Sequence, residues 1–361
     1  MSTSQKVLVV GAGIIGASIA YHLAQRGARV TLVDRGQPAG EATEKSFAWI
    51  NASYGNAEPY FRLRLLAMQE YRRLEQELGG TLRVNWCGCL SWDLTDQELE
   101  DYARRHGAWG YDVRLVEQPE IRVLEPKLID PPQRAAYAAG EATLDPVAAT
   151  KALLEGAERH GATIRLGCEV TDFVTRGSRL CGAKTAEEDI EADSLVLAAG
   201  VDCGPLAGRL GVSLPMRSSP GLLLHCKPTP PLLKRVVESP GLHVKQELDG
   251  RLVVGEDFGG GPVSNDPAAE AERLLTRLKS RLRGSEDVEL ERVTVGLRPI
   301  PADGLPAVGF ARNIGSLYIA VMHNGITLAP AVGRFAAMEI LDGVQVALLD
   351  PFRPARFQSA A

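Results

Sequence analysis

The chain has 361 residues, of which 45% are hydrophobic and 24% are charged, and its formal net charge is −5. This length favours two domains or one elaborated α/β body. The negative charge balance and the lack of a long Lys/Arg run exclude a typical nucleic-acid-binding protein. Neither a run of about 18 apolar residues nor a secretory leader pattern is found, so we expect a soluble, cytoplasmic protein without a membrane span.

A nucleotide-binding βαβ unit is predicted at the start of the chain. Residues 7–10 are a fully apolar run, which is typical of a central parallel strand. A helix is expected over 14–26 and ends at Gly27. A second strand is expected over 28–33, and Asp34 stands at its end. This order and length are those of a dinucleotide-binding unit.

The turn between the first strand and the helix has the spacing Gly11-x-Gly13-x-x-Gly16. The first glycine permits the tight turn, the second lets the backbone approach a pyrophosphate, and the third allows close helix packing. The helix N-terminus offers unpaired N–H groups to the anion. Asp34 can accept hydrogen bonds from ribose hydroxyls. The pattern predicts a bound dinucleotide, but NAD and FAD share it.

Further elements follow from apolar periodicity and turn residues. Helices are expected over 56–78, 146–160 (with Asp145 as N-cap), 267–282 and 329–341. Strands are expected over 86–90, 163–166, 180–184, 194–198, 222–226, 242–245, 251–254 and 317–321. Between 217 and 290, proline-rich loops alternate with β-type segments, which indicates a mainly antiparallel sheet on the substrate side.

The cysteines predict neither a metal site nor a disulfide. All six are scattered and lack histidines at zinc-ligand spacing. Cys87 and Cys89 alternate within the expected strand 86–90, which would put both thiols on one face. Reduced, buried thiols are the ordinary state in a cytosolic chain.

Three separated segments resemble parts of one flavin site. They are the glycine turn with Asp34, the strand ending Ala198-Ala199-Gly200, and a C-terminal region with Gly296-Leu297-Arg298-Pro299 and Asn324-Gly325-Ile326-Thr327. The loop 40–46 and the segment 250–255 complete the pattern. In this order the chain resembles the D-amino-acid-oxidase superfamily of FAD-dependent oxidoreductases, most closely its bacterial glycine oxidase and sarcosine oxidase members, over nearly its whole length.

The resemblance implies an α/β fold with two domains. An FAD-binding, Rossmann-like domain would be assembled from residues 1–80, 144–215 and 295–361. A mainly antiparallel β substrate domain would comprise residues 81–143 and 216–294.

The resemblance also implies a cofactor site. FAD would be non-covalent, because residues 291–296 contain no cysteine where covalent-flavin relatives carry one. The residues expected to bind it are Gly11, Gly13, Ile14, Ile15, Gly16, Asp34, Arg35, Thr43, Lys45, Ser46, Ala48, Trp49, Val170, Ala199, Gly200, Arg298, Asn324, Gly325, Ile326 and Thr327.

The substrate implied by the resemblance is an amino acid with a free carboxylate. Arg298 matches the arginine that binds this carboxylate in glycine oxidase, and its planar fork suits bidentate recognition. Other positions depart from glycine oxidase: His243 stands for a tyrosine, His323 for an arginine, Phe258 for a methionine and Asn51 for a glycine. Trp49 and Tyr54 add bulk. The altered pocket favours a larger or N-substituted amino acid over glycine, with Asn51, Tyr54, His243, Phe258, Arg298 and His323 as substrate-binding residues.

The predicted reaction is hydride transfer from Cα to flavin N5, giving an imine that hydrolyses to an oxo acid and ammonia or an amine. Oxygen is the expected acceptor, with peroxide as product. Arg298, His323 and His243 are the catalytic candidates, although no general base is required if the amine binds deprotonated. His243 and His323 could hydrogen-bond the substrate or bias amine protonation. A structural role is favoured for His243 and is an even alternative for His323.

Three other functions compete with this one. A D-amino-acid or imino-acid dehydrogenase with a non-oxygen acceptor stays open, as does a nucleotide-binding protein without turnover. An NAD(P)-dependent reductase leaves the segments at Gly200 and Gly325 unexplained. The oligomeric state, a homo-oligomer included, is also open.

Overall fold

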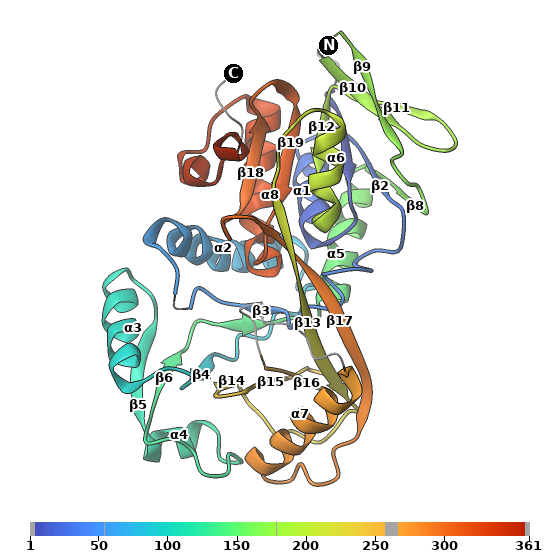
Figure 1. The fold of residues 1–361 in the computed structure, drawn as a ribbon. Coiled ribbons are helices and arrows are strands. Elements are labelled where there is room, and N and C mark those ends of the chain that lie inside the picture. Colours follow the sequence, from blue (N-terminus) through green and yellow to red (C-terminus); the bar gives the residue numbers. More distant parts are fainter. Residues whose placement is uncertain (1–3, 54, 178, 257–265, 358–361) are drawn as a thin grey trace.

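The computed structural model describes residues 4–53, 55–177, 179–256 and 266–357. Two large sheets organise this part of the chain, and Figure 1 shows them in the upper and lower halves of the molecule. The upper sheet has six strands and the lower one eight. This two-part α/β architecture agrees with the expected combination of a nucleotide-binding domain and a β substrate domain.

The six-stranded sheet is doubly covered. Its strands run in the order β18-β19-β12-β1-β2-β8, all parallel except β18, which pairs antiparallel with β19. The strands are β1 (Lys6–Val10), β2 (Arg29–Asp34), β8 (Thr163–Leu166), β12 (Ser194–Leu197), β18 (Ala307–Ala311) and β19 (Ile314–Val321). Three distant stretches of sequence therefore meet in one sheet, while the exact domain limits stay a prediction.

Residues of β1 alternate between two cores, as a central strand requires. Val7 and Val9 pack into the larger apolar cluster, which also includes residues of the long helices, and Leu8 and Val10 pack into a second cluster on the opposite face. The larger cluster draws on α1 (Ile14–Gln25), α2 (Glu58–Glu77), α5 (Pro146–Arg159) and α8 (Gly325–Asp342). The second draws on α6 (Cys203–Arg209) and on a small sheet of β9 (Asp172–Arg176), β10 (Arg179–Lys184) and β11 (Asp189–Glu191).

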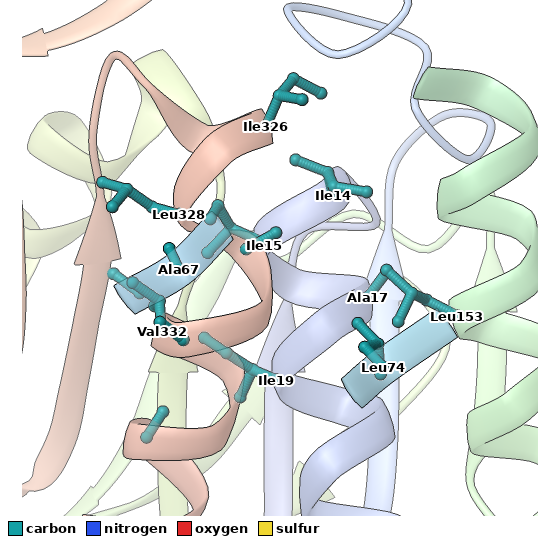
Figure 2. Packing of buried hydrophobic residues seen from close by; sticks show 14 of the residues in the cluster. Ile14, Ile15, Ala17, Ile19, Ala67, Leu74, Leu153, Ile326, Leu328 and Val332 are labelled. Carbon is teal, nitrogen blue, oxygen red and sulfur yellow. The ribbon is translucent and has the colours of Figure 1, made fainter. Parts of the chain in front are cut away.

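Helices α1 and α8 pack side by side beneath the nucleotide-binding edge of the sheet. Figure 2 shows Ile15 between these helices, with Ile14 and Ile326 at their upper ends and Ile19 facing Val332 lower down. Because both helices begin at the same level, this apolar contact fixes their two N-termini next to each other.

The eight-stranded sheet has the order β17-β13-β16-β15-β14-β4-β6-β5. All neighbours are antiparallel except β14 and β4, as the mainly antiparallel prediction requires. Its strands are β4 (Cys89–Ser91), β5 (Val113–Glu117), β6 (Arg134–Ala138), β13 (Met216–Cys226), β14 (Val236–Ser239), β15 (Leu242–Gln246), β16 (Leu252–Gly255) and β17 (Leu290–Pro301).

One face of this sheet is covered by helices and the other faces the nucleotide-binding half. Leu242 and Val244 of β15 share a cluster with Leu274 and Leu278 of α7 (Pro267–Arg281). The smaller helices are α3 (Asp96–Ala108) and α4 (Gln118–Leu124). The long antiparallel ribbon of β13 and β17 runs between the two halves in Figure 1. A short pair, β3 (Trp49–Ile50) with β7 (Ala142–Thr143), lies above the inner face.

Most predicted elements are confirmed, and four boundaries were wrong; the strand expected over 317–321 begins at Ile314. The strand expected over 86–90 begins only at Cys89, because Gly88 adopts a φ of +75° and breaks the extended run. The helix expected from residue 329 begins at Gly325. The strand expected over 222–226 extends back to Met216 along its partner β17.

All six cysteines are free, and no cluster of metal-binding side chains occurs within the described ranges. In the same ranges, no helix is long and apolar enough to cross a membrane.

Candidate active site

A cavity of about 540 Å³ opens at the carboxyl ends of the parallel strands. Its walls come from the start of α1, the end of β2, the loop 36–46, the residues after β12 and the residues between β19 and α8. In doubly wound sheets, this edge is where ligands bind. Leu297 and Pro299 of β17 close one side, so the second half of the molecule also contributes.

The glycine turn at the cavity floor leaves no room for side chains. A Cβ on Gly11 would lie 2.5 Å from the carbonyl oxygen of Ala198, and Gly11 has a φ of +115°. A Cβ on Gly16 would lie 1.9 Å from the carbonyl oxygen of Gly11. Gly13 caps α1 without a side chain, and the first turn has no acidic residue. The positive end of the α1 dipole therefore faces the cavity.

Asp34 braces this turn as well as lining the cavity. Its Oδ2 accepts a hydrogen bond from the Ala12 N–H at 2.7 Å, and its Oδ1 accepts one from the Gly36 N–H at 2.7 Å. A carboxylate has further lone pairs available for hydroxyl donors. The neighbouring Arg35 forms an ion pair with Asp202 at 2.9 Å on the cavity rim.

A second helix N-terminus meets the same cavity. His323, Gly325 and Ile326 line it at the start of α8, where Asn324 provides no side-chain cap. The Asn324 amide instead donates to the Tyr60 hydroxyl at 2.9 Å. The N-termini of two helices thus lie at one cavity, which suits a ligand that carries negative charge at two places. The cradle fits a dinucleotide with a phosphate end and an electron-accepting ring.

Arg298 and His323 come together at the α8 end of the site. Arg298 alternates with the cavity-lining Leu297 and Pro299, and its guanidinium lies over Gly221 of β13, with Nη1 3.5 Å from the Ser219 hydroxyl. Burial, together with the positive charges of Arg298 and Arg64, lowers the pKa of His323 to about 4. His323 is therefore neutral near pH 7 and lies within the field of two arginines.

His243 lies on the inner face of the eight-stranded sheet, away from the cavity walls described above. It pairs in register with Glu238, whose other neighbour is Ser91. The His243 Nε2 is 3.6 Å from Asp93 Oδ2 and 3.9 Å from Glu238 Oε1, and the Ser91 hydroxyl donates to Glu238 at 2.6 Å. His243 thus belongs to a buried polar row that faces the nucleotide-binding half.

The segment 49–52 joins the two halves of the site. The Trp49 indole N–H donates to Glu141 at 2.7 Å, and the Thr327 hydroxyl donates to the Trp49 carbonyl at 3.2 Å. The Asn51 N–H donates to Thr327 Oγ1 at 3.3 Å. Glu141, which precedes β7, also accepts from the Tyr111 hydroxyl. The start of α8 is therefore tied to the substrate sheet through this segment.

The predicted residues fall into three groups. Those that line the cavity are Gly11, Gly13, Ile14, Ile15, Asp34, Arg35, Thr43, Ser46, Val170, Ala199, Gly200, His323, Gly325 and Ile326. Those that the structure describes but that do not line the cavity are Gly16, Lys45, Ala48, Trp49, Asn51, His243, Arg298, Asn324 and Thr327. Tyr54 and Phe258 lie outside the described residues.

Two buried polar residues next to the site were not foreseen. Arg64 projects from α2 and bonds to Asn51, and Glu141 holds Trp49 and Tyr111. Arg64 interrupts the apolar stripe of its helix, which is the signal that could have revealed it. Glu141 lies in the short connection between β6 and β7 and carries no such signal.

Comparison with known proteins identifies the family. The sequence model of the family described as "FAD dependent oxidoreductase" (DAO) matches residues 6–339. The chain belongs to this family of FAD-dependent oxidoreductases. It is an FAD-dependent enzyme, and the two helix N-termini at the cavity are suited to this cofactor.

Relatives match this oxidoreductase along their whole length. Glycine oxidase from Pseudomonas aeruginosa is 29% identical, over 96% of this chain and 97% of that protein. The crystal structure of glycine oxidase from Geobacillus kaustophilus superposes with a TM-score of 0.89 at 25% identity, covering 99% and 100% of the two chains. The crystal structure of iminodiacetate oxidase from Chelativorans sp. BNC1 superposes with a TM-score of 0.83 at 26% identity, covering 96% of this chain and 98% of that one.

The Glu141 network predicts a specific pH dependence of stability. Burial raises the pKa of Glu141 from its ordinary 4.5 to about 8, and the charge of Glu238 adds to this against the hydrogen bonds from Tyr111 and Trp49. Because the folded-state pKa is raised, the protonated carboxyl is the form that folding favours. Its stabilisation is fully present below pH 4.5 and is lost as the pH rises through about 8.

We expect the free energy of unfolding of the wild type, relative to that of Glu141→Gln, to fall steadily from pH 5 to pH 8. Urea unfolding of both proteins at matched pH values measures this difference, in which the other titrating groups cancel. A difference that stays constant over this range would show that Glu141 is ionised in the folded enzyme.

Proposed function

We propose that the enzyme is an oxidase of N-substituted glycines. In this reaction R–NH–CH₂–COO⁻, O₂ and H₂O give R–NH₂, glyoxylate and H₂O₂. The observation that carries the proposal is that His323 lines the cavity at its α8 end, while the Arg298 guanidinium lies next to Ser219 of β13, close enough for its charge to act on His323. This arrangement pairs a carboxylate-binding fork with an uncharged group next to the position of the reacting carbon.

The relatives support this substrate class. The matched proteins include glycine oxidases and an iminodiacetate oxidase, and iminodiacetate is itself an N-substituted glycine. The bound FAD would supply the redox chemistry, as acceptor of the substrate hydride and donor of electrons to oxygen.

The residues of the chain would orient the substrate and tune its charge. The Arg298 guanidinium offers parallel N–H donors that hold a carboxylate in one plane and so fix the orientation of Cα. His323 has a pKa of about 4, so it adds no positive charge near pH 7 that would repel an amine, and its ring nitrogen can accept a hydrogen bond. The N-terminal dipole of α8 would stabilise negative charge that develops at this end of the cradle.

Oxygen uptake with matched amines tests the proposal. We expect sarcosine and larger N-alkylglycines to drive oxygen consumption with equimolar glyoxylate and peroxide, at a higher kcat/KM than glycine. Turnover of glycine alone would refute the preference for N-substituted substrates. Reduction by N-alkylglycines under nitrogen with no oxygen uptake in air would instead identify a dehydrogenase with another acceptor.

A further inference from the structure

Arg64 is a buried cation whose charge has no ionic partner among the described residues. Only 5% of its surface is exposed, yet none of the ion pairs in this part of the molecule includes it. A buried guanidinium is costly unless an anion lies beside it. Two other arginines of the same helix behave differently: the exposed Arg62 pairs with Glu58, and the half-buried Arg73 pairs with Glu77.

The guanidinium of Arg64 is also only partly hydrogen-bonded. Its Nε donates to the Asn51 carbonyl at 3.0 Å, and its Nη2 donates to the Asn51 side-chain oxygen. A guanidinium has five N–H groups, so three of them lack a protein partner within the described ranges. Both of these hydrogen bonds come from Nε and Nη2, which leaves Nη1 available to an anion.

Several contacts place the Arg64 side chain, which projects from α2, near the first turn of α8. Its partner Asn51 bonds through its backbone to Thr327 in the first turn of that helix. The Arg64 Cζ lies 5.6 Å from the centre of the Tyr60 ring, and the Tyr60 hydroxyl accepts from Asn324. The charges of Arg64 and Arg298 both lower the pKa of His323, so both guanidinium groups lie within electrostatic range of one imidazole.

Nearby acids do not neutralise Arg64 near pH 7. The positive charge of Arg64 lowers the pKa of Glu141, but burial outweighs this effect and raises that pKa to about 8. The Glu141 carboxyl is therefore mostly protonated at neutral pH. Asn51, the direct partner, is neutral. The site therefore has two permanent positive charges around His323, whereas one is sufficient for a substrate with a single carboxylate.

We propose that Arg64 binds a second carboxylate of the substrate, and that the enzyme acts on dicarboxylic secondary amines of the N-(carboxyalkyl)glycine class. Arg298 holds the carboxylate next to the reacting carbon, and Arg64 holds the carboxylate at the far end of the N-substituent. Asn51 fixes the orientation of the Arg64 fork through its two hydrogen bonds. This inference deepens the proposed function and rests on it.

Binding of unreactive thioether analogues to the FAD-loaded enzyme tests the second site without turnover. Thiodiacetate carries two carboxylates and methylthioacetate carries one, and each is followed by its perturbation of the visible flavin spectrum. We expect the wild type to bind thiodiacetate at least tenfold more tightly than methylthioacetate. In Arg64→Gln, the Kd of thiodiacetate should rise about 10- to 100-fold, as for a lost charge-assisted pair, while that of methylthioacetate changes less than threefold. Arg62→Gln, an exposed arginine of the same helix, should match the wild type.

The opposite results are equally clear. If Arg64→Gln binds both analogues more weakly by the same factor, Arg64 binds the carboxylate that the two analogues have in common, or the cofactor. If the binding of neither analogue is weakened, Arg64 has a structural role. Either outcome overturns the proposal. If Arg64→Gln does not fold, Arg64→Lys replaces it. Because lysine keeps the charge but lacks the planar fork, the Kd of thiodiacetate should rise about 3- to 10-fold, while that of methylthioacetate should not change.

A kinetic comparison separates this inference from the proposed function. In Arg64→Gln, kcat/KM for iminodiacetate should fall at least tenfold relative to that for sarcosine. If the wild type oxidises sarcosine and the ratio does not change, only the inference about Arg64 fails. If the wild type oxidises neither amine, the proposed function fails, while the analogue titration still reports on the Arg64 site.

Discussion

Gly16→Ala is expected to yield a protein that loses most of its FAD on purification. A Cβ at this position would lie 1.9 Å from the carbonyl oxygen of Gly11, and both groups are backbone-fixed. The strand-to-helix turn must therefore shift, at a cost of about 1–3 kcal/mol or more. The same shift moves the N–H groups that face the cofactor phosphates, so the affinity for FAD should fall about 10- to 100-fold.

The flavin-to-protein absorbance ratio and the Kd for added FAD measure this effect. Gly208→Ala is the matched control, because a Cβ at this exposed position of α6 would meet no atom within 4 Å. It should retain full flavin content. Normal FAD binding by Gly16→Ala would mean that the turn does not have the tight geometry described here.

Arg298→Gln is expected to lower kcat/KM for amino-acid substrates about 10- to 100-fold. The substitution removes a charge-assisted, bidentate partner of the carboxylate, which contributes about 1.5–3 kcal/mol. Flavin content should not change, because the Arg298 side chain lies over Gly221 and beside Ser219 of β13, not along the floor of the cradle.

Steady-state kinetics of two companion variants sharpen this expectation. Arg298→Lys should recover part of the loss, since it restores the charge but not the planar fork. Arg292→Gln alters an exposed arginine on the same strand, which lies 3.6 Å from Glu44, and should behave like the wild type. If Arg298→Gln retained wild-type kcat/KM, the substrate carboxylate would have to bind elsewhere.

The framework of the nucleotide-binding half was predictable because its signals are local. An apolar run, a glycine turn and an amphipathic helix each report on their own backbone, and β1, α1 and β2 lie where the sequence predicted them. The start of α8 was missed for the opposite reason. Gly325 is a poor helix former and Pro330 resembles a first-turn residue. The packing of Ile326 and Leu328 in the core shared with α1 holds this turn in the helix (Figure 2).

The candidate site was predictable only in part. Glycine spacing and the resemblance to known oxidases located the cofactor cradle, and the cavity lining contains most of those residues. The Arg64–Asn51 and Glu141–Trp49 contacts join residues that are 13 and 92 positions apart in the sequence. Such pairs arise from tertiary packing of polar groups, which no periodic pattern encodes. A charged residue on an apolar helix stripe, as at Arg64, is the one local trace of them.

The most direct test of the account is an anaerobic titration of the purified, FAD-loaded enzyme. Sarcosine, iminodiacetate, glycine, D-alanine and proline are added separately, and the visible absorbance of the flavin is recorded before and after air is readmitted. We predict that N-substituted glycines bleach the flavin and that air restores its colour. A flavin that keeps its full absorbance with all five amines, or a colourless protein that does not take up FAD, would contradict the account.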